Sequence, residues 1–88
     1  MILLIEEMFE AGAKRIGILK EESVSSDPVY YAGEFYLDHP NGYDDYYPKC
    51  DRIQNPERFH SDRGVAMDAF LNIVEILTVE ERKNHAAH

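Results

Sequence analysis

Tryptophan is absent from this 88-residue sequence, cysteine occurs once, and nine basic residues stand against seventeen acidic ones. The single cysteine, Cys50, excludes an internal disulfide and indicates a reducing compartment, so we expect a cytoplasmic protein. The shortage of Lys and Arg leaves a net charge of −8. This charge disfavours direct binding to nucleic-acid phosphates or to an anionic membrane, because both require cations. It favours a basic protein as the partner.

Long hydrophobic runs are also missing. The apolar start, residues 1–5, is followed at once by Glu6 and Glu7. It lacks the basic flank of a signal peptide and the roughly 20 residues of a membrane span, so we expect neither. Hydrophobic residues make up 44% of the chain and charged residues 30%, which is typical of a folded domain. We expect one domain over residues 1–88, with 84–88 set aside as a tail or tag remnant.

The first three quarters of the chain predict a small, mostly antiparallel sheet of two to four strands with a helix before it. Glu6, Glu7 and Glu10 share one side at helical spacing, which predicts a helix over residues 2–11 that Gly12 ends. The expected strands cover residues 15–20, 29–37 and, more weakly, 43–47. An Asn-Gly turn joins the last two strands. The fold class is therefore expected to be α+β.

The last quarter predicts a long helix that packs on this sheet. Ser61 or Asp62 is expected to cap a helix over residues 63–77. Residues 78–81, Thr-Val-Glu-Glu, match a capping box, which predicts a bend at Thr78 and a short terminal helix.

The long helix carries an unusually wide apolar surface, because its polar residues form one narrow stripe of Asp68, Asn72 and Glu75. So much apolar surface must be buried on most sides. Phe70, Ile73 and Leu77 are therefore candidates for an oligomer interface. A structural or assembly subunit that forms a homodimer through this helix is our alternative function.

The most unusual feature of the sequence is a window of tyrosine and acid. All six tyrosines lie between residues 30 and 47, and residues 21–51 hold eight acidic residues but one basic residue, a net charge of −7. Tyrosine contributes large rigid contact area, and carboxylates beside it suit a partner rich in Arg or Lys. The residues that we expect to bind such a partner are Tyr30, Glu34, Tyr36, Asp38, Tyr43, Asp44, Asp45, Tyr46, Tyr47 and Asp51.

This window has three interpretations. Tyrosine is a good strand former, and acids keep an exposed strand edge soluble, so the window is also typical of an ordinary sheet edge. As a binding face, it is expected to contact a basic protein. In the narrower version, the partner is a nucleic-acid-binding protein or nuclease complex whose groove the acidic face occupies as a nucleic-acid mimic. The expected function is a non-catalytic inhibitor or modulator.

The sequence contains no motif for a metal, a cofactor or catalysis. His39, Cys50 and His60 are suitable metal ligands, but they lack the paired spacing of a structural zinc site. The pairing of Cys50 with either histidine has no flanking signature of a nucleophile and base. We therefore expect no metal, no cofactor and no enzymatic activity.

Overall fold

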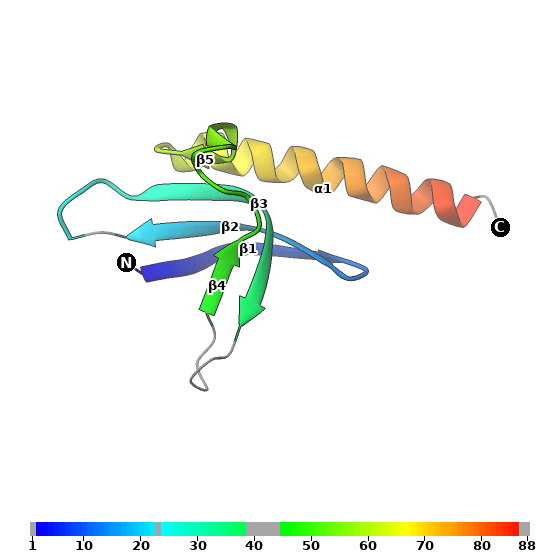
Figure 1. The fold of residues 1–88 in the computed structure, drawn as a ribbon. Helices are drawn as coiled ribbons and strands as arrows, with labels where there is room; N and C mark the ends of the chain where they lie inside the picture. The colour runs from blue at the N-terminus through cyan, green and yellow to red at the C-terminus, as the bar shows by residue number, and fades with distance from the viewer. Residues whose placement is uncertain (1, 23, 39–44, 87–88) are drawn as a thin grey trace.

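A computed structural model describes residues 2–22, 24–38 and 45–86 of the chain, and its fold is α+β (Figure 1). An antiparallel sheet and one long helix form two layers. The elements in chain order are β1 (Ile2–Ala11), β2 (Lys14–Glu22), β3 (Val29–Asp38), β4 (Asp45–Pro48), the 3₁₀ helix η1 (Pro56–Arg58), β5 (Phe59–His60) and α1 (Arg63–Ala86).

The expected N-terminal helix is wrong, because residues 2–11 form strand β1. This strand pairs with β2 along its whole length, from Ile2 opposite Glu22 to Ala11 opposite Lys14. A β-bulge at Glu6 shifts the register between Ile5 and Glu7. The bulge interrupts the alternation of a regular strand, so the run of Leu, Glu and Met imitates a helical pattern in the sequence.

Gly12 adopts the positive φ that its sequence context predicts, but in a different role. Its φ of 61° lies in the two-residue turn between β1 and β2 and not at the end of a helix. A hairpin turn with glycine at its first central position matches the twist of the two strands.

The sheet runs in the order β1-β2-β3-β4, so strands that follow one another in the chain lie side by side. The first part of β3, from Val29 to Glu34, pairs with β2. The remainder, from Phe35 to Asp38, pairs with β4, and β5 pairs with β3 near its start. The two strands predicted over residues 15–20 and 29–37 are confirmed. The predicted return strand is confirmed over Asp45–Pro48.

Helix α1 covers one face of the sheet. The core on this side is formed by the buried residues Ile16, Ile18, Tyr30, Ala32, Ala66 and Phe70. On the opposite face the buried residues are Leu19, Tyr31 and Phe35, and Tyr46, Cys50 and Phe59 pack against them. The centre of the sheet is therefore covered on both faces.

Gly17 of β2 allows the ring of Phe35 to lie close to the backbone on the face of the sheet opposite α1. A Cβ atom added there would lie 2.5 Å from the carbonyl oxygen of Glu7 and 2.7 Å from the ring of Phe35. Glycine leaves room for the ring to lie over the backbone of β2. This contact positions Phe35 at the place where β3 passes from β2 to β4.

Helix α1 is longer and straighter than the sequence predicts. Asp62 caps it, since its Oδ1 accepts hydrogen bonds from the backbone of Gly64 at 2.7 Å and of Val65 at 3.3 Å. The expected bend at Thr78 is wrong, because the Thr78 hydroxyl donates to the Val74 carbonyl at 2.8 Å and the helix continues to Ala86. Figure 1 shows α1 continuing beyond the β1–β2 turn. None of the described helices has the length and apolar character needed to traverse a bilayer.

Candidate functional site

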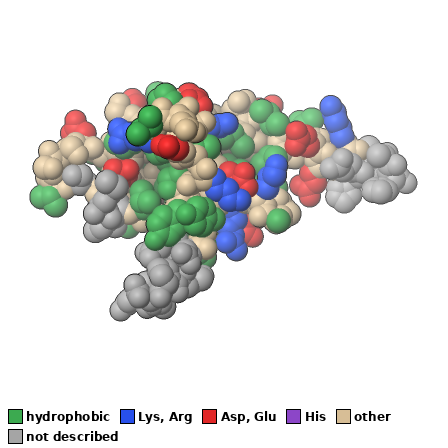
Figure 2. Space-filling model, in the orientation of Figure 1, with side chains coloured by type: hydrophobic (Ala, Val, Ile, Leu, Met, Phe, Trp, Pro, Cys, Tyr) green, Lys and Arg blue, Asp and Glu red, His purple; other side chains and the backbone are tan. Residues whose placement is uncertain are grey.

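Two tyrosines of the β3–β4 hairpin form an exposed aromatic pair. Tyr36 lies opposite Tyr47 in the register of the hairpin. Their rings stack with centroids 5.2 Å apart and planes inclined by 23°. Tyr36 is 45% exposed, and Tyr47 is partly exposed. Figure 2 shows hydrophobic side chains gathered over β4 and the neighbouring part of β3.

The other described tyrosines face inward. Tyr30 is buried under α1, and Tyr31 is 1% exposed on the opposite face of the sheet. Tyr46 packs edge-on against Phe35, with ring centroids 5.9 Å apart. These three side chains support the core, so of the described tyrosines the surface pair is Tyr36 with Tyr47.

The acidic residues of the window do not form one continuous patch. Glu21, Glu22 and Asp27 lie near one end of β3, and the β3–β4 hairpin lies at the other. A ten-residue strand is about 33 Å long, which separates the two groups. A partner of ordinary size that contacts the hairpin therefore lies close to only some of the acidic residues of the window.

Two of the candidate acids have structural contacts. The Glu34 carboxylate accepts a hydrogen bond from Lys49 Nζ at 3.0 Å. The Oδ1 of Asp51 accepts a hydrogen bond from the backbone of Ile53 at 2.9 Å, which stabilises the turn after β4. Asp38 and Asp45 face each other at the end of the hairpin in backbone register. Tyr43 and Asp44 lie outside the described residues.

The three residues expected at an oligomer interface lie on the sheet-facing side of α1. Phe70 is 6% exposed, and Ile73 and Leu77 pack against the same core cluster. The exposed apolar residues of α1 are different ones. They are Val65, Leu71, Ile76 and Val79, each roughly half exposed.

The potential metal ligands and nucleophiles are dispersed. Among the described side chains, no three His, Cys, Asp or Glu residues come together in a way suited to a metal ion. His39 lies outside the described residues, and Nε2 of His60 is buried without a hydrogen-bond partner in the described structure. Cys50 lies beside Tyr31, whose hydroxyl donates to the Glu34 carbonyl. Burial raises the pKa of the Tyr31 hydroxyl well above its usual range, and a hydrogen bond with Cys50 raises it further.

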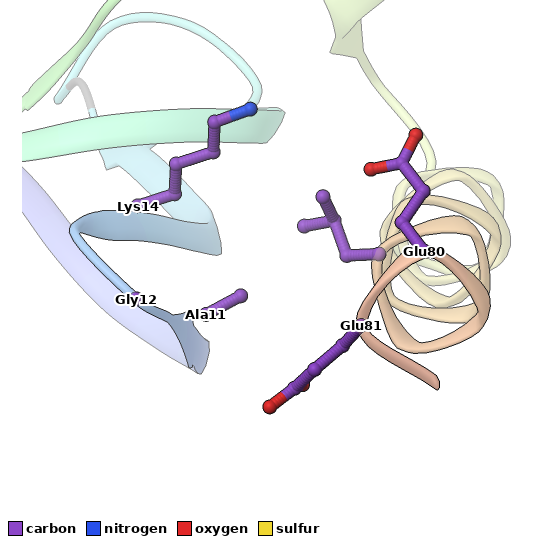
Figure 3. A pocket seen from close by; sticks show the side chains of 6 residues that line it. Ala11, Gly12, Lys14, Glu80 and Glu81 are labelled. Carbon is purple, nitrogen blue, oxygen red and sulfur yellow. The ribbon is translucent and has the colours of Figure 1, made fainter. Parts of the chain in front are cut away.

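Two neighbouring cavities open between α1 and the sheet, and both include Lys14 and Leu77. The first, of about 310 Å³, lies between the β1–β2 turn and the second half of α1. Figure 3 shows Ala11, Gly12 and Lys14 on one side of it and Glu80 and Glu81 on the other. The second, of about 210 Å³, extends toward Glu34 and Arg58.

Sequence reasoning missed both cavities. Their lining residues come from separate elements and share no spacing along the chain, so only the packing of α1 brings them together. The sequence pattern could have identified the exposed apolar stripe of α1, because Val65, Ile76 and Val79 repeat at helical spacing. Phe70, Ile73 and Leu77 repeat in the same way, and the sequence does not indicate which of the two stripes the sheet covers.

Comparisons with protein-family models, with curated proteins and with solved structures find no match to this chain.

Proposed function

We propose that this protein is a non-catalytic binding protein whose β3–β4 hairpin contacts a basic surface of another protein. The observation that carries this proposal is the stacked pair of Tyr36 and Tyr47 on the surface of the hairpin. Stacking holds both rings in place before binding, so a partner gains aromatic contact area at little cost in conformational entropy. Tyrosine is enriched where protein interfaces derive most of their affinity.

The charge around this pair supports a basic partner. Asp38 is the last residue of β3, Asp45 is the first residue of β4 and Asp44 precedes it in the sequence, while Lys49 already neutralises Glu34. Arginine and lysine from a partner gain charge-assisted hydrogen bonds to such carboxylates and cation–π contacts with the tyrosines. The narrower proposal is that the partner handles nucleic acid, and that the hairpin occupies part of its phosphate-binding groove as an inhibitor or modulator.

The test begins with a partner captured from the native host and measures association and dissociation rates. Replacing Tyr36 or Tyr47 by Ala should raise the dissociation rate by an amount equivalent to about 1–3 kcal/mol. Replacing Asp44 and Asp45 together by Asn should slow association and weaken its salt dependence. Competition by a DNA duplex for the same partner tests the narrower proposal.

Leu71→Ala is the matched control, because Leu71 is an exposed apolar residue on α1. It should leave both rates unchanged. Circular dichroism must show that all variants remain folded. If the tyrosine and aspartate variants also bind with unchanged rates, the window is an ordinary soluble sheet edge and the proposal is wrong.

A second function, self-assembly through α1, is favoured by the outward face of the helix. Val65, Asn72, Ile76 and Val79 follow one another at intervals of seven, four and three residues, the spacing of a coiled-coil seam, while Ala69, at the remaining seam position, is partly buried against the core cluster. Val65, Ile76 and Val79 are 44–50% exposed. Asn72 lies in the middle of the seam, where one polar residue fixes register at some cost in stability.

A second copy of this chain is the occupant that we propose for the seam. In an antiparallel pair of α1 helices, Asp68 of one copy comes near Arg82 of the other, which favours that orientation.

Sedimentation over a range of concentrations tests this pairing. Ile76→Glu should shift the chain to monomer, because it introduces a charge into the apolar seam. Leu71→Glu makes the same kind of change on another side of α1 and should leave the dimer intact. A wild-type chain that is monomeric at every concentration would exclude self-assembly and would leave the proposal for the hairpin unaffected.

A further inference from the structure

The smaller cavity under α1 brings together side chains from four elements around one partly open pocket. Its volume is about 210 Å³. The residues that determine its chemistry are Lys14 and Ile16 of β2, Glu34 of β3, Arg58 of η1, and Ile73 and Leu77 of α1. Figure 2 shows Lys and Arg side chains gathered beside β3 below α1.

The charges in this cavity are unbalanced. Glu34 is paired with Lys49 at 3.0 Å, so its negative charge is already compensated. Among the side chains that the structure describes, no carboxylate forms an ion pair with Lys14 or Arg58. Arg58 is also partly buried. A cation withdrawn from water normally has an anionic partner, so the cavity is a favourable place for an anion in a chain of net charge −8.

The apolar residues that line the cavity indicate what else the ligand must contain besides its anionic group. Ile16 is buried, and Ile73 and Leu77 are partly exposed apolar residues. The volume of this cavity, about 210 Å³, is below the range of about 300–1,000 Å³ that drug-sized ligands occupy. The space therefore suits one anionic group attached to a compact apolar body.

We infer that this cavity binds a small monocarboxylate, such as a branched-chain or single-ring carboxylic acid. Its carboxylate lies between Lys14 and Arg58, and its apolar body lies against Ile73 and Leu77. A planar guanidinium matches a carboxylate in geometry as well as in charge. The inference is independent of the hairpin and of helix pairing, because the cavity lining includes neither the stacked tyrosines of the hairpin nor the seam residues of α1.

Cys50 provides a built-in reporter for the test, since it lines the same cavity and is the only cysteine of the chain. We expect benzoate and 3-methylbutanoate to slow the reaction of Cys50 with a neutral aromatic disulfide. Benzamide, which has the ring without the charge, should protect weakly, and so should inorganic phosphate, which has charge without an apolar body. Benzoate should also shift the methyl resonances of Ile73 and Leu77 in the wild-type protein.

Substitutions at the charged lining residues test which side chains bind the carboxylate. Arg58→Gln and Lys14→Gln should each raise the half-protecting benzoate concentration about tenfold or more, as expected for the loss of a charge-assisted hydrogen bond. Glu34→Gln should lower it, because it removes a nearby negative charge. Arg82→Gln, at an exposed position outside the cavity, is the matched control and should change nothing. Equal protection by benzamide or phosphate, unshifted methyl resonances, or unchanged protection in both cation variants would overturn the inference.

Discussion

Tyr31 places a titratable hydroxyl inside the face of the sheet opposite α1. Its side chain is 1% exposed, and its hydroxyl donates to the carbonyl of Glu34. Because burial raises the pKa of this hydroxyl in the folded state, the folded protein holds the proton more tightly than the unfolded chain does. The resulting stabilisation is complete below the unfolded pKa of about 10 and is lost as pH rises toward the folded value.

We therefore expect the free energy of unfolding to fall above about pH 10, by up to about 1.4 kcal/mol per pH unit from Tyr31 alone. Tyr31→Phe should flatten this fall and should cost about 1 kcal/mol at neutral pH, through the lost hydrogen bond. Urea unfolding at a series of pH values measures both effects. Exposed Tyr36→Phe is the control, and an equal flattening by it would show that Tyr31 is not responsible.

At the scale of single residues, the sequence predicts part of the candidate surface. The alternation along β3 correctly separates Tyr36 from the face that carries Phe35. It does not indicate that Tyr30, on the same side as Tyr36, is covered by α1. Nor does it distinguish Tyr46 from Tyr47, since that choice depends on the register in which β4 pairs with β3. The pairing of Glu34 with Lys49 also follows from register and not from local sequence.

Among the elements, β1 is where sequence reasoning fails. Leu, Glu, Met and Ala favour helices, and the bulge at Glu6 removes the regular alternation that would have indicated a strand. What stabilises β1 as a strand is its pairing with β2, an interaction between two segments. Helix α1 was predictable because its cap and its apolar repeat are local. Its continuation past Thr78 was not predicted, because the Thr78 hydroxyl donates to the Val74 carbonyl within the helix and does not cap a new one, which the capping-box pattern does not reveal.

The cap of α1 gives a prediction for this element. Asp62→Ala should lower the free energy of unfolding by about 1 kcal/mol, because the backbone amides of Gly64 and Val65 lose their acceptor. The neighbouring Ser61→Ala should change it by less than about 0.5 kcal/mol, as expected for an exposed residue outside the cap. Chemical denaturation of the two variants measures the difference. Equal losses would show that Asp62 does not cap α1 in solution.

At the scale of the whole molecule, the net charge of −8 and the shape affect different properties. The acidic residues at the two ends of β3 promote solubility and attract basic partners wherever they lie. The shape follows from α1, which extends past the sheet and gives a radius of gyration of 14.3 Å, compared with about 12 Å for a compact chain of this length. The sequence predicted the charge and the fold class but not the extended shape, which results from the orientation of α1 on the sheet.

We expect this fold to form without a metal ion. Its core consists of apolar contacts on both faces of the sheet, and the described His, Cys and acidic residues do not converge. A strong chelator should therefore leave the midpoint of thermal unfolding unchanged, since a structural zinc contributes its binding free energy to folding. The measurement is a thermal melt followed by circular dichroism, with and without chelator. A markedly lower midpoint with chelator would reveal a metal site.

The order β1-β2-β3-β4 has a kinetic consequence. Each strand from β1 to β4 pairs with its neighbour along the chain, so this part of the sheet closes only short loops, whereas the pairing of β5 with β3 and the docking of α1 join segments far apart in sequence and cost more entropy. The sheet should therefore form before α1 docks. Ile18→Val in the sheet should then slow refolding, and Ile73→Val in the docked helix should speed unfolding at a similar loss of about 1 kcal/mol. In stopped-flow experiments the two variants should move opposite arms of the chevron plot. The contacts between α1 and the sheet would then set the lifetime of the native state.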